Sequence, residues 1–331
     1  MTQSSRMKAL VLDHANGPFN LMKIPRPVPG PGEVLVRIHA SGVNPLDAKI
    51  RAGAAGHARH PLPGILGIDM AGEVEAVGEG VTAFQPGDAV YGMTGGVGGV
   101  QGSLAEYAAV DAALLAHKPS NLSMREAAAL PLITITAWEG LVDRARVQAG
   151  QTVLVLGGTG GVGHVAIQIA RAFGAQVFAT ADSVRHGLVE ALGATPIDRN
   201  TPAADIVARY TAGRGFDLVY DTAGGASLDA AFAAVARFGH VVSALGWGTH
   251  ALAPLSFKAA SYSGVFTLLP LLTGEGRARH GEILGQAAKL AERGLLAPRL
   301  DPRLFDSNAV DQAHAALSDG TATGKLVISM I

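Results

Sequence analysis

The segment Thr152–Gly174 constrains the fold of this chain more than any other stretch. Its first part, Val153–Leu156, is a short apolar run of strand-forming residues, as a buried parallel strand requires. Glycines spaced G-x-G-x-x-G follow, and apolar residues then recur at helical spacing over Val162–Phe173 until Gly174, where a helix would end. A strand, a glycine-rich turn and an amphipathic helix in direct succession predict a site for the two phosphates of a dinucleotide.

The glycine-rich turn supplies the predicted phosphate contacts. They are Gly158, Thr159, Gly160, Gly161, Val162 and Gly163. We assign the tight turn to Gly158, the approach of the pyrophosphate to the backbone to Gly160, and the close packing of helix on strand to Gly163. The first N–H groups of the helix and its positive dipole end would face the phosphates. The alternative is an ordinary glycine-rich turn between a strand and a helix, since the spacing alone is a weak signature.

Length and composition narrow the class of protein. A chain of 331 residues exceeds the roughly 250–300 at which a single core stops growing, so two lobes are expected. A net charge of -1 does not favour a nucleic-acid partner, and the absence of cysteine excludes disulfides and thiolate metal sites. No apolar stretch reaches the ~18 residues of a membrane span, and the polar start Met1–Met7 is unlike a signal peptide. A cytoplasmic protein without a membrane partner is therefore expected.

The two lobes differ in the order of their predicted elements. The first third has strands separated by turns, which predicts a barrel-like, mainly antiparallel lobe. Its strands are predicted at Met7–Asp13, Glu33–Ser41, Gly72–Val77, Asp88–Tyr91 and Leu104–Val110. From Gln151 onward strands and helices alternate, which predicts a doubly wound parallel sheet with a cofactor across the carboxyl ends of its strands. Those strands are predicted at Val153–Leu156, Val177–Thr180, Thr195–Asp198, Leu218–Asp221 and Val241–Leu245, and the helices at Val162–Phe173, Val184–Leu192, Ala203–Thr211 and Ser227–Phe238.

The last third is expected to return to the first lobe. Val265–Pro270 is a β-prone segment that would cross back, and Gly324–Met330 is predicted as a final strand of that lobe. The predicted domains are therefore a first segment at residues 1–126, a dinucleotide-binding domain at 127–264, and a return segment at 265–331 that completes the first lobe.

Several motifs in a consistent order resemble the medium-chain dehydrogenase/reductase superfamily, and within it the zinc-free quinone oxidoreductases, the zeta-crystallin-like branch. Besides the glycine turn, they lie in Ser41–Arg51, Gly67–Gly92, Gly102–Tyr107, Ala127–Leu141 and Gly324–Ile328. The resemblance covers nearly the whole chain. It implies an α/β protein with a GroES-like catalytic domain and a Rossmann domain, and a homodimer in which edge strands of the cofactor domain pair.

The activity that this resemblance implies is hydride transfer from NADPH to a small-molecule quinone or activated enone, without a metal. The nicotinamide carries the chemistry, and the protein supplies orientation and hydrogen-bond donors. One alternative is a zinc-independent enzyme acting on another carbonyl or on an enoyl thioester. A second alternative is an NADPH-binding protein without catalysis.

The same resemblance argues against zinc. Zinc-dependent relatives place ligands, usually cysteine, histidine and cysteine, at the positions that match Asn44, Ile68 and Leu132. Isoleucine and leucine cannot ligate zinc, and an amide is a poor ligand. Ordinary alcohol oxidation would then lack its Lewis acid, so no catalytic metal is expected.

Asn44 and Thr136 are the residues that the resemblance implies at the reacting centre. Asn44 would lie near the nicotinamide and hydrogen-bond substrate or cofactor; the alternative is that it caps the turn before Pro45. Thr136 would lie near the nicotinamide carboxamide; the alternative is a threonine that bonds its own helix backbone. Asp47 and Asp69 are expected to be structural hydrogen-bond acceptors.

Three further cofactor contacts are implied outside the glycine turn. Leu245 and Gly246 end a predicted strand, where the resembling family flanks the cofactor. Lys325 matches a basic residue that in relatives lies near the nicotinamide end; the alternative is an ordinary surface charge.

The choice between NADPH and NADH depends on the residues after the second strand of the sheet. An acidic residue at its tip would bind the ribose diol and favour NADH, but Ala181 occupies that position and Asp182 lies one residue further. Ser183 and Arg185 would hold a 2′-phosphate, the arginine through its forked donors. Asp182 has the alternative of capping the helix that begins near Val184. Because the branch usually prefers NADPH, NADPH is the expected cofactor, with NADH as the alternative.

Overall fold

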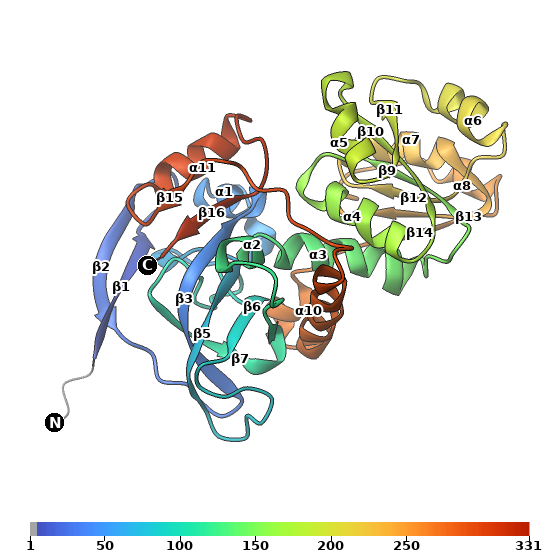
Figure 1. The fold of residues 1–331 in the computed structure, drawn as a ribbon. Helices are drawn as coiled ribbons and strands as arrows, with labels where there is room; N and C mark the ends of the chain where they lie inside the picture. Colours follow the sequence, from blue (N-terminus) through green and yellow to red (C-terminus); the bar gives the residue numbers. More distant parts are fainter. Residues whose placement is uncertain (1–4, 331) are drawn as a thin grey trace. The chain divides into compact units, whose positions relative to one another are not determined.

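The strand that precedes the glycine turn lies inside a six-stranded sheet (Figure 1). Its strands, in spatial order, are β11 (Thr195–Asp198), β10 (Gln176–Ala181), β9 (Thr152–Leu156), β12 (Phe216–Asp221), β13 (Val235–Ser243) and β14 (Ser261–Gly264). All neighbouring pairs are parallel. The chain runs outward from β9 to β11, returns to β12 on the other side of β9, and continues outward to β14. In such a sheet the crevice at the carboxyl ends of β9 and β12 is where ligands bind.

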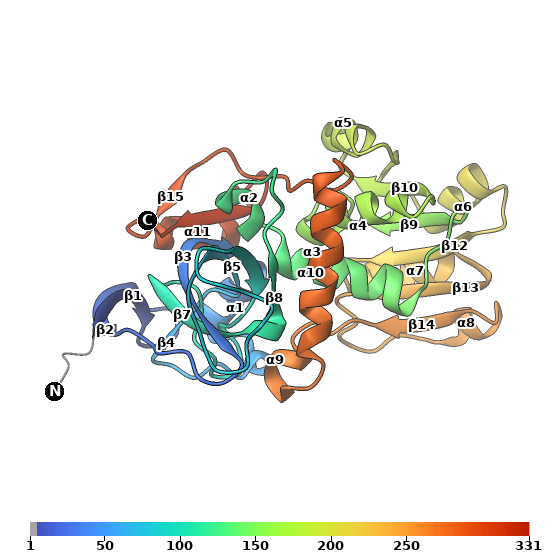
Figure 2. The same cartoon turned by 60° about the horizontal axis from the view of Figure 1, so that its bottom comes forward.

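Helices cover both faces of this sheet (Figures 1 and 2). They are α3 (Pro131–Trp138), which continues as the π-helical turn Glu139–Arg144, and α4 (Gly161–Ala172), α5 (His186–Ala191), α6 (Ala203–Thr211), α7 (Ala226–Ala234) and α8 (Ala253–Ser256). Leu154 and Leu156 of β9 share one core with Leu228 and Phe232 of α7. The connections through α4 and α7 run in opposite directions along the sheet, and right-handed crossovers then place these helices on opposite faces.

The remaining chain is built mainly on antiparallel strands. One sheet has the order β15–β16–β3–β5–β6–β8, with β7 paired to β3, and a smaller sheet has the order β2–β1–β4. Their bounds are β1 (Arg6–Leu12), β2 (Phe19–Pro25), β3 (Glu33–Val43), β4 (Gly64–Ile65), β5 (Asp69–Val77), β6 (Ala89–Met93), β7 (Tyr107–Asp111), β8 (Leu115–His117), β15 (Phe305–Asp306) and β16 (Leu326–Ser329). Val34, Val36 and Ile38 alternate along β3 and lie in one core with Met70 and Val74 of β5.

Helices of 5 to 16 residues belong to this part of the chain. They are α1 (Pro45–Arg51), α2 (Met124–Ala128), α9 (Leu269–Thr273), α10 (Arg277–Glu292) and α11 (Val310–Ser318). The 3₁₀ turns of the chain lie at Gly56–Ala58, Ala112–Leu114 and Ser183–Arg185. β16, close to the C-terminus, pairs antiparallel with β3.

This computed structural model describes residues 5–330, and their contacts divide the chain into two units. Unit 1 comprises the chain up to Leu132, Leu268–Gly294 and the chain from Pro298 onward. Unit 2 comprises Ile133–Thr267 and Leu295–Ala297. The sequence placed the domain limits after residues 126 and 264, whereas the contacts place them after 132 and 267, because α3 begins in one unit and continues into the other.

Some predicted elements differ from the structure; the strand predicted over Val241–Leu245, for example, is β13, which runs from Val235 to Ser243. The helix predicted over Ser227–Phe238 ends at Ala234, and its last residues belong to β13, since Val235 pairs with Phe216. The β-prone segment Val265–Pro270 is not a strand; the strand lies just before it, in β14, and a helix begins at Leu269. Strand β7 begins later than predicted. For the predicted helix and the β-prone segment, the apolar spacing fits helix and strand equally over a few residues, and pairing with a neighbouring strand decides.

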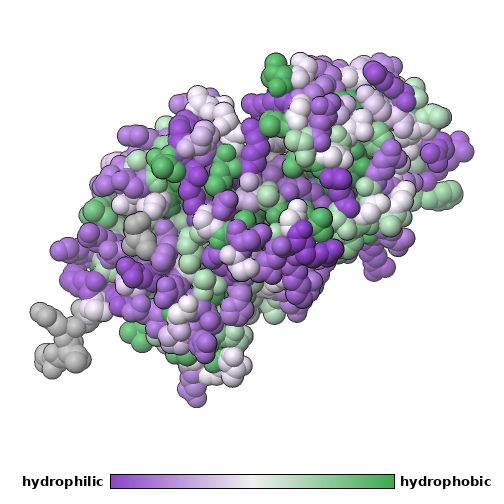
Figure 3. Space-filling view, in the orientation of Figure 1, coloured by the Kyte–Doolittle hydropathy of each residue, from purple (hydrophilic) through white to green (hydrophobic). Residues whose placement is uncertain are grey.

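Within residues 5–330 none of the helices has the length and apolar character that crossing a membrane would require. Hydrophilic and hydrophobic residues are intermingled on the face drawn in Figure 3.

Candidate functional site

The glycine turn joins the carboxyl end of β9 to the first turn of α4. Gly160 is the N-cap of α4, and Gly160 and Gly161 are exposed, whereas Gly158 and Gly163 are buried. The first N–H groups of a helix have no acceptor within the helix, so they and the dipole favour an anion here. A Cβ added at Gly160 would lie 3.3 Å from the Gly157 carbonyl oxygen. Because glycine has no Cβ, the backbone at this position is open to an approaching phosphate. These residues fit the pyrophosphate of a dinucleotide.

Gly157, the residue before the motif, takes part in the tight turn together with Gly158, because the Gly157 carbonyl oxygen accepts the N–H of Gly160 at 3.1 Å and the turn so closed contains Gly158. Gly157 has φ +84°, in the left-handed region that favours glycine, and Gly158 is outside that region. A Cβ at Gly158 would lie 2.6 Å from the Ala179 Cβ of β10, so this glycine is needed for packing. A Cβ at Gly163 would lie 2.1 Å from the Gly157 carbonyl oxygen, in line with close packing of α4 on the turn.

An arginine that the sequence analysis missed lies at the tip of β10. Asp182 follows β10, and its carboxylate forms an ion pair with Nε of Arg199 at 2.8 Å. Arg199 directly follows β11, which is the neighbour of β10 in the sheet. Ser183 and Arg185 form an exposed turn at the same edge. The side chain of Asp182 makes no capping hydrogen bond to that turn, so the capping interpretation is not supported.

A buried carboxylate ties the ends of β12 and β13 together. Asp221 is fully buried and accepts hydrogen bonds from the N–H groups of Ala223 and Gly224, both at 3.1 Å, and from Oγ of Ser243 at 2.7 Å. Oγ of Ser243 in turn accepts from the N–H of Leu245 at 3.1 Å. The loop that begins at Leu245 is thus held against the end of β12.

Thr136 lies on α3, in unit 2, and is buried. Its hydroxyl lies 3.0 Å from that of Thr267, and its carbonyl accepts a hydrogen bond from the Tyr220 hydroxyl at 2.7 Å. Oγ1 of Thr267 donates to Oε2 of Glu139 at 3.3 Å. Burial raises the pKa of Tyr220, so its hydroxyl remains a donor that holds this part of α3.

Asn44 lies in unit 1, at the start of α1, and is fully buried. Its Nδ2 donates to Oδ2 of Asp69 at 2.9 Å, and its backbone N–H donates to Oδ2 of Asp47 at 2.8 Å. Nζ of Lys325 donates to Oδ1 of Asn44, and to the carbonyl oxygen of Val43 at 3.1 Å. Asn44 is the N-cap residue of α1, but its carboxamide is directed to an ammonium and a carboxylate.

Burial governs the charges of this cluster. Burial raises the pKa of Asp47 to about 7 and that of Asp69 to about 6, although hydrogen bonds from Asn44 and the ammonium of Lys325 oppose both shifts. Burial also lowers the pKa of Lys325, against the attraction of both carboxylates. Asp69 additionally accepts from the N–H of Leu132 at 2.8 Å. The expectation that Asp47 and Asp69 are structural acceptors agrees with these bonds.

The structure gathers the predicted site residues into separate groups. The carboxyl edge of the unit 2 sheet carries Gly158, Thr159, Gly160, Gly161, Val162, Gly163, Asp182, Ser183, Arg185, Leu245 and Gly246. Asn44 and Lys325 form one buried cluster in unit 1, and Thr136 lies on α3. Lys325 is 6% exposed, which rules out the alternative of an ordinary surface charge.

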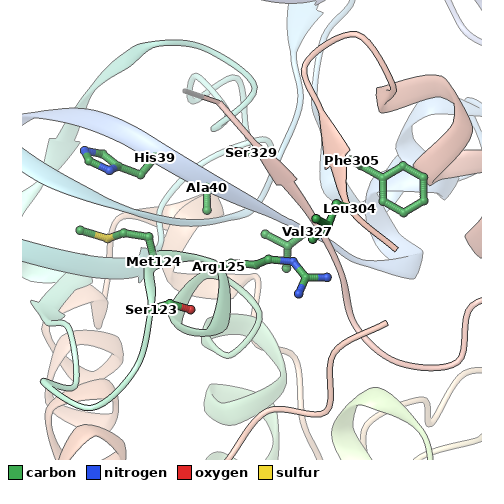
Figure 4. Close-up of a pocket in the computed structure, with 9 residues that line it drawn as sticks. All are labelled: His39, Ala40, Ser123, Met124, Arg125, Leu304, Phe305, Val327 and Ser329. Carbon is green, nitrogen blue, oxygen red and sulfur yellow. The ribbon is translucent and has the colours of Figure 1, made fainter. Parts of the chain in front are cut away.

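A pocket of about 540 Å³ lies elsewhere in unit 1 (Figure 4). It is lined by His39, Ala40, Ser123, Met124, Arg125, Leu304, Phe305, Val327 and Ser329. Nη2 of Arg125 donates to the carbonyl oxygens of Asp301 and Arg303, so this arginine holds a loop. The residues predicted to bind cofactor or substrate are not among those that line this pocket.

Metal-ligating side chains are not gathered within residues 5–330: three or more His, Asp or Glu do not meet in any arrangement that could hold an ion. At the positions where zinc-dependent relatives have ligands, Ile68 is buried in the apolar core and Leu132 contributes its N–H to Asp69. These residues do not fit a zinc ion.

Two family models match the chain, an alcohol dehydrogenase GroES-like domain over residues 30–120 and a zinc-binding dehydrogenase over residues 192–328. The chain is 35% identical over 309 residues to an NADPH-dependent alkenal/one oxidoreductase, chloroplastic, of Arabidopsis thaliana, covering 89% of this chain and 72% of the relative. It is 31% identical over 307 residues to a quinone oxidoreductase of Homo sapiens, covering 91% of this chain and 90% of the relative.

A solved structure shares the whole architecture. The crystal structure of an alcohol dehydrogenase superfamily protein from Novosphingobium aromaticivorans superposes with a TM-score of 0.97 at 61% identity, covering 98% of this chain and 100% of that one.

Proposed function

The chain belongs to the medium-chain dehydrogenase/reductase superfamily, in its zinc-free, quinone-oxidoreductase-like branch, and on this basis we propose that it uses NADPH to reduce a quinone or an activated enone. It is an oxidoreductase of the alcohol dehydrogenase-like fold, and its relatives are named for hydride transfer to quinones and alkenals or enones. The glycine turn at the carboxyl end of β9, exposed at Gly160 and Gly161, is the observation that carries the proposal. The nicotinamide supplies the hydride when bound.

The preference for NADPH over NADH is supported by the charges at the tip of β10. A free carboxylate there would repel a 2′-phosphate, but Arg199 pairs with Asp182 and offsets its charge. The guanidinium groups of Arg199 and Arg185, with the hydroxyl of Ser183, can then meet the phosphate as forked and single donors. NADPH should therefore bind more tightly than NADH in a titration; tighter NADH would contradict this choice of cofactor.

Replacing Arg199 with alanine is expected to weaken NADPH binding about tenfold or more while leaving NADH affinity nearly unchanged. The variant removes a phosphate donor and also leaves the Asp182 carboxylate without its partner, and both changes disfavour the 2′-phosphate. Fluorescence titration with each nucleotide measures the effect. Arg214→Ala is the matched control, since Arg214 is exposed in the turn that precedes β12, at the opposite edge of the sheet. An equal loss for both nucleotides would contradict the assignment.

We assign the contacts with the reacting parts of substrate and cofactor to Asn44 and Thr136. Asn44 would donate an N–H to the oxygen that gains charge as hydride arrives, and Thr136 would orient the nicotinamide carboxamide. Reduction of a quinone then balances as one hydride from NADPH and one proton from water, giving the hydroquinone and NADP⁺. A quinone needs no strong acid because the aromatic ring of the product stabilises its oxygen. This agrees with a site that holds no zinc ligands.

The experiment that tests this function is the oxidation of NADPH with a panel of quinones, enones, enoyl thioesters and simple carbonyls. Turnover with quinones or enones, unchanged by a chelator, is expected. Turnover only with enoyl thioesters or simple carbonyls would replace the substrate class. Tight NADPH binding without any turnover would indicate a binding protein, and loss of activity with a chelator, restored by zinc, would contradict the metal-free reaction.

The proposal includes a homodimer in the cytoplasm. β14 is the last strand of the unit 2 sheet, with one edge not paired among the described strands. Such edges pair readily with a second strand. Tyr262 on β14 is partly exposed, and Phe238 of β13 and Phe257 just before β14 are 85% and 87% exposed. Light scattering should give twice the mass of one chain; a single-chain mass at micromolar concentration would contradict the dimer, and cell fractionation tests the location.

A further inference from the structure

The carboxamide of Asn44 is held at both of its ends by charged side chains. Lysine can only donate, so Nζ of Lys325 must face the amide oxygen, and this leaves the amide nitrogen to face Asp69. We propose that Lys325 and Asp69 are positioning residues that fix the Asn44 carboxamide in one orientation, with its second Nδ2 hydrogen as the donor to the reducible substrate. This rests on the proposed function, in which Asn44 contacts the substrate.

The backbone of Asn44 is held as firmly as its side chain. The Asp47 carboxylate accepts the N–H of Asn44, and the Lys325 ammonium holds the carbonyl of Val43, the residue before it. The amide group therefore cannot turn by moving the main chain without breaking a bond to a buried charge. A carboxamide that is free to rotate presents either an oxygen or an N–H to a ligand. Here the three charged neighbours leave only the N–H.

The composition of the cluster supports positioning over simple stabilisation. Two buried carboxylates and one buried ammonium are costly to desolvate, and apolar residues in their place are often as stable. Buried charges of this kind have a role other than stability if they hold the neighbouring side chains in one arrangement. Asp69 does this for two elements at once, since its other oxygen accepts the N–H of Leu132 in the first turn of α3, the helix that carries Thr136. One carboxylate thus holds both the Asn44 carboxamide and the first turn of α3.

The first test is a double-mutant cycle on turnover. Lys325→Met keeps the length of the side chain and removes its charge, and it is expected to lower kcat about tenfold to hundredfold with the Kd for NADPH unchanged. Asn44→Ala should lower kcat by a similar factor, and the double variant should be no slower than Asn44→Ala alone, because Lys325 acts only through Asn44. Lys289→Met, an exposed lysine on α10, is the matched control. Wild-type kcat in Lys325→Met, or additive losses in the double variant, would overturn the inference.

The second test reads the amide group itself and needs no turnover. In a nitrogen–proton correlation spectrum the side-chain pair lost in Asn44→Ala is that of Asn44. In the wild type this pair should exchange slowly with water, and in Lys325→Met it should shift and exchange faster. An unchanged pair would overturn the inference even if the enzyme reduces quinones. If the pair changes in Lys325→Met but the wild-type protein oxidises NADPH with none of the acceptors tested, the result would contradict the proposed function and not this inference. If Lys325→Met does not fold, Asp69→Asn, which conserves shape and removes the charge on the other side, is expected to disturb the same pair.

Discussion

Replacing Gly163 with alanine is expected to destabilise unit 2 by about 3 kcal/mol and to abolish NADPH binding with it. The added Cβ would lie 2.1 Å from the carbonyl oxygen of Gly157, and that oxygen belongs to the backbone, which cannot rotate away like a side chain. α4 would have to move off the turn. Chemical denaturation followed by circular dichroism measures the loss of stability, and nucleotide titration measures the loss of binding.

Gly160→Ala separates stability from binding. Its Cβ would meet the nearest atom, the Gly157 oxygen, at 3.3 Å, and Gly160 has φ -75°, which alanine adopts without strain. The fold should survive, but the methyl group would occupy the approach of the pyrophosphate. We expect NADPH affinity to fall about tenfold to hundredfold with little change in the unfolding free energy. If Gly160→Ala bound NADPH as the wild type does, the phosphates would not rest on this turn.

Replacing Asp221 with alanine is the second change with a large expected effect. The N–H groups of Ala223 and Gly224 and the hydroxyl of Ser243 would lose their acceptor inside unit 2. Ser243 is fully buried, and a buried donor without a partner costs about 1–3 kcal/mol, so a loss of that size in the unfolding free energy is expected. Ala223 is exposed, and its N–H can bond to water instead. The loop at Leu245 would also loosen, because Ser243 orients its N–H, and NADPH binding should weaken.

The control for Asp221 is Asp205→Ala on α6, where the carboxylate is exposed. It should stay within about 0.5 kcal/mol of the wild type. Thermal and denaturant unfolding of both variants decide the matter. Equal stability of Asp221→Ala and Asp205→Ala would show that the hydrogen bonds of Asp221 are replaceable by water.

Much of unit 2 could be predicted because its elements have local causes. β11 has the predicted bounds, Thr195–Asp198, and α4 begins one residue before the predicted start at Val162. The residues after α7 were harder to predict, because the apolar residues before Phe238 suit helix and strand alike. Pairing with β12, a partner far along the chain, decides where α7 ends.

Arg199 was within reach of sequence reasoning and was still missed. Its strand was predicted correctly, and adjacent parallel strands end at one edge, so the residue after β11 had to lie near Asp182. Gly157 is a different case. Only the backbone angles show that the glycine before the motif also adopts a left-handed conformation.

The sequence by itself predicted the class of fold and the glycine turn, since both follow from the residue types at short spacing. The lack of zinc ligands at Asn44, Ile68 and Leu132 followed from the resemblance to relatives that have ligands there. The tertiary structure alone decided that Lys325 meets Asn44, two residues at opposite ends of the chain. No local pattern encodes that meeting, because it arises from the pairing of β16 with β3. The orientation of the Asn44 amide therefore depends on long-range pairing, whereas the bare nitrogens of the glycine turn depend on a few adjacent residues.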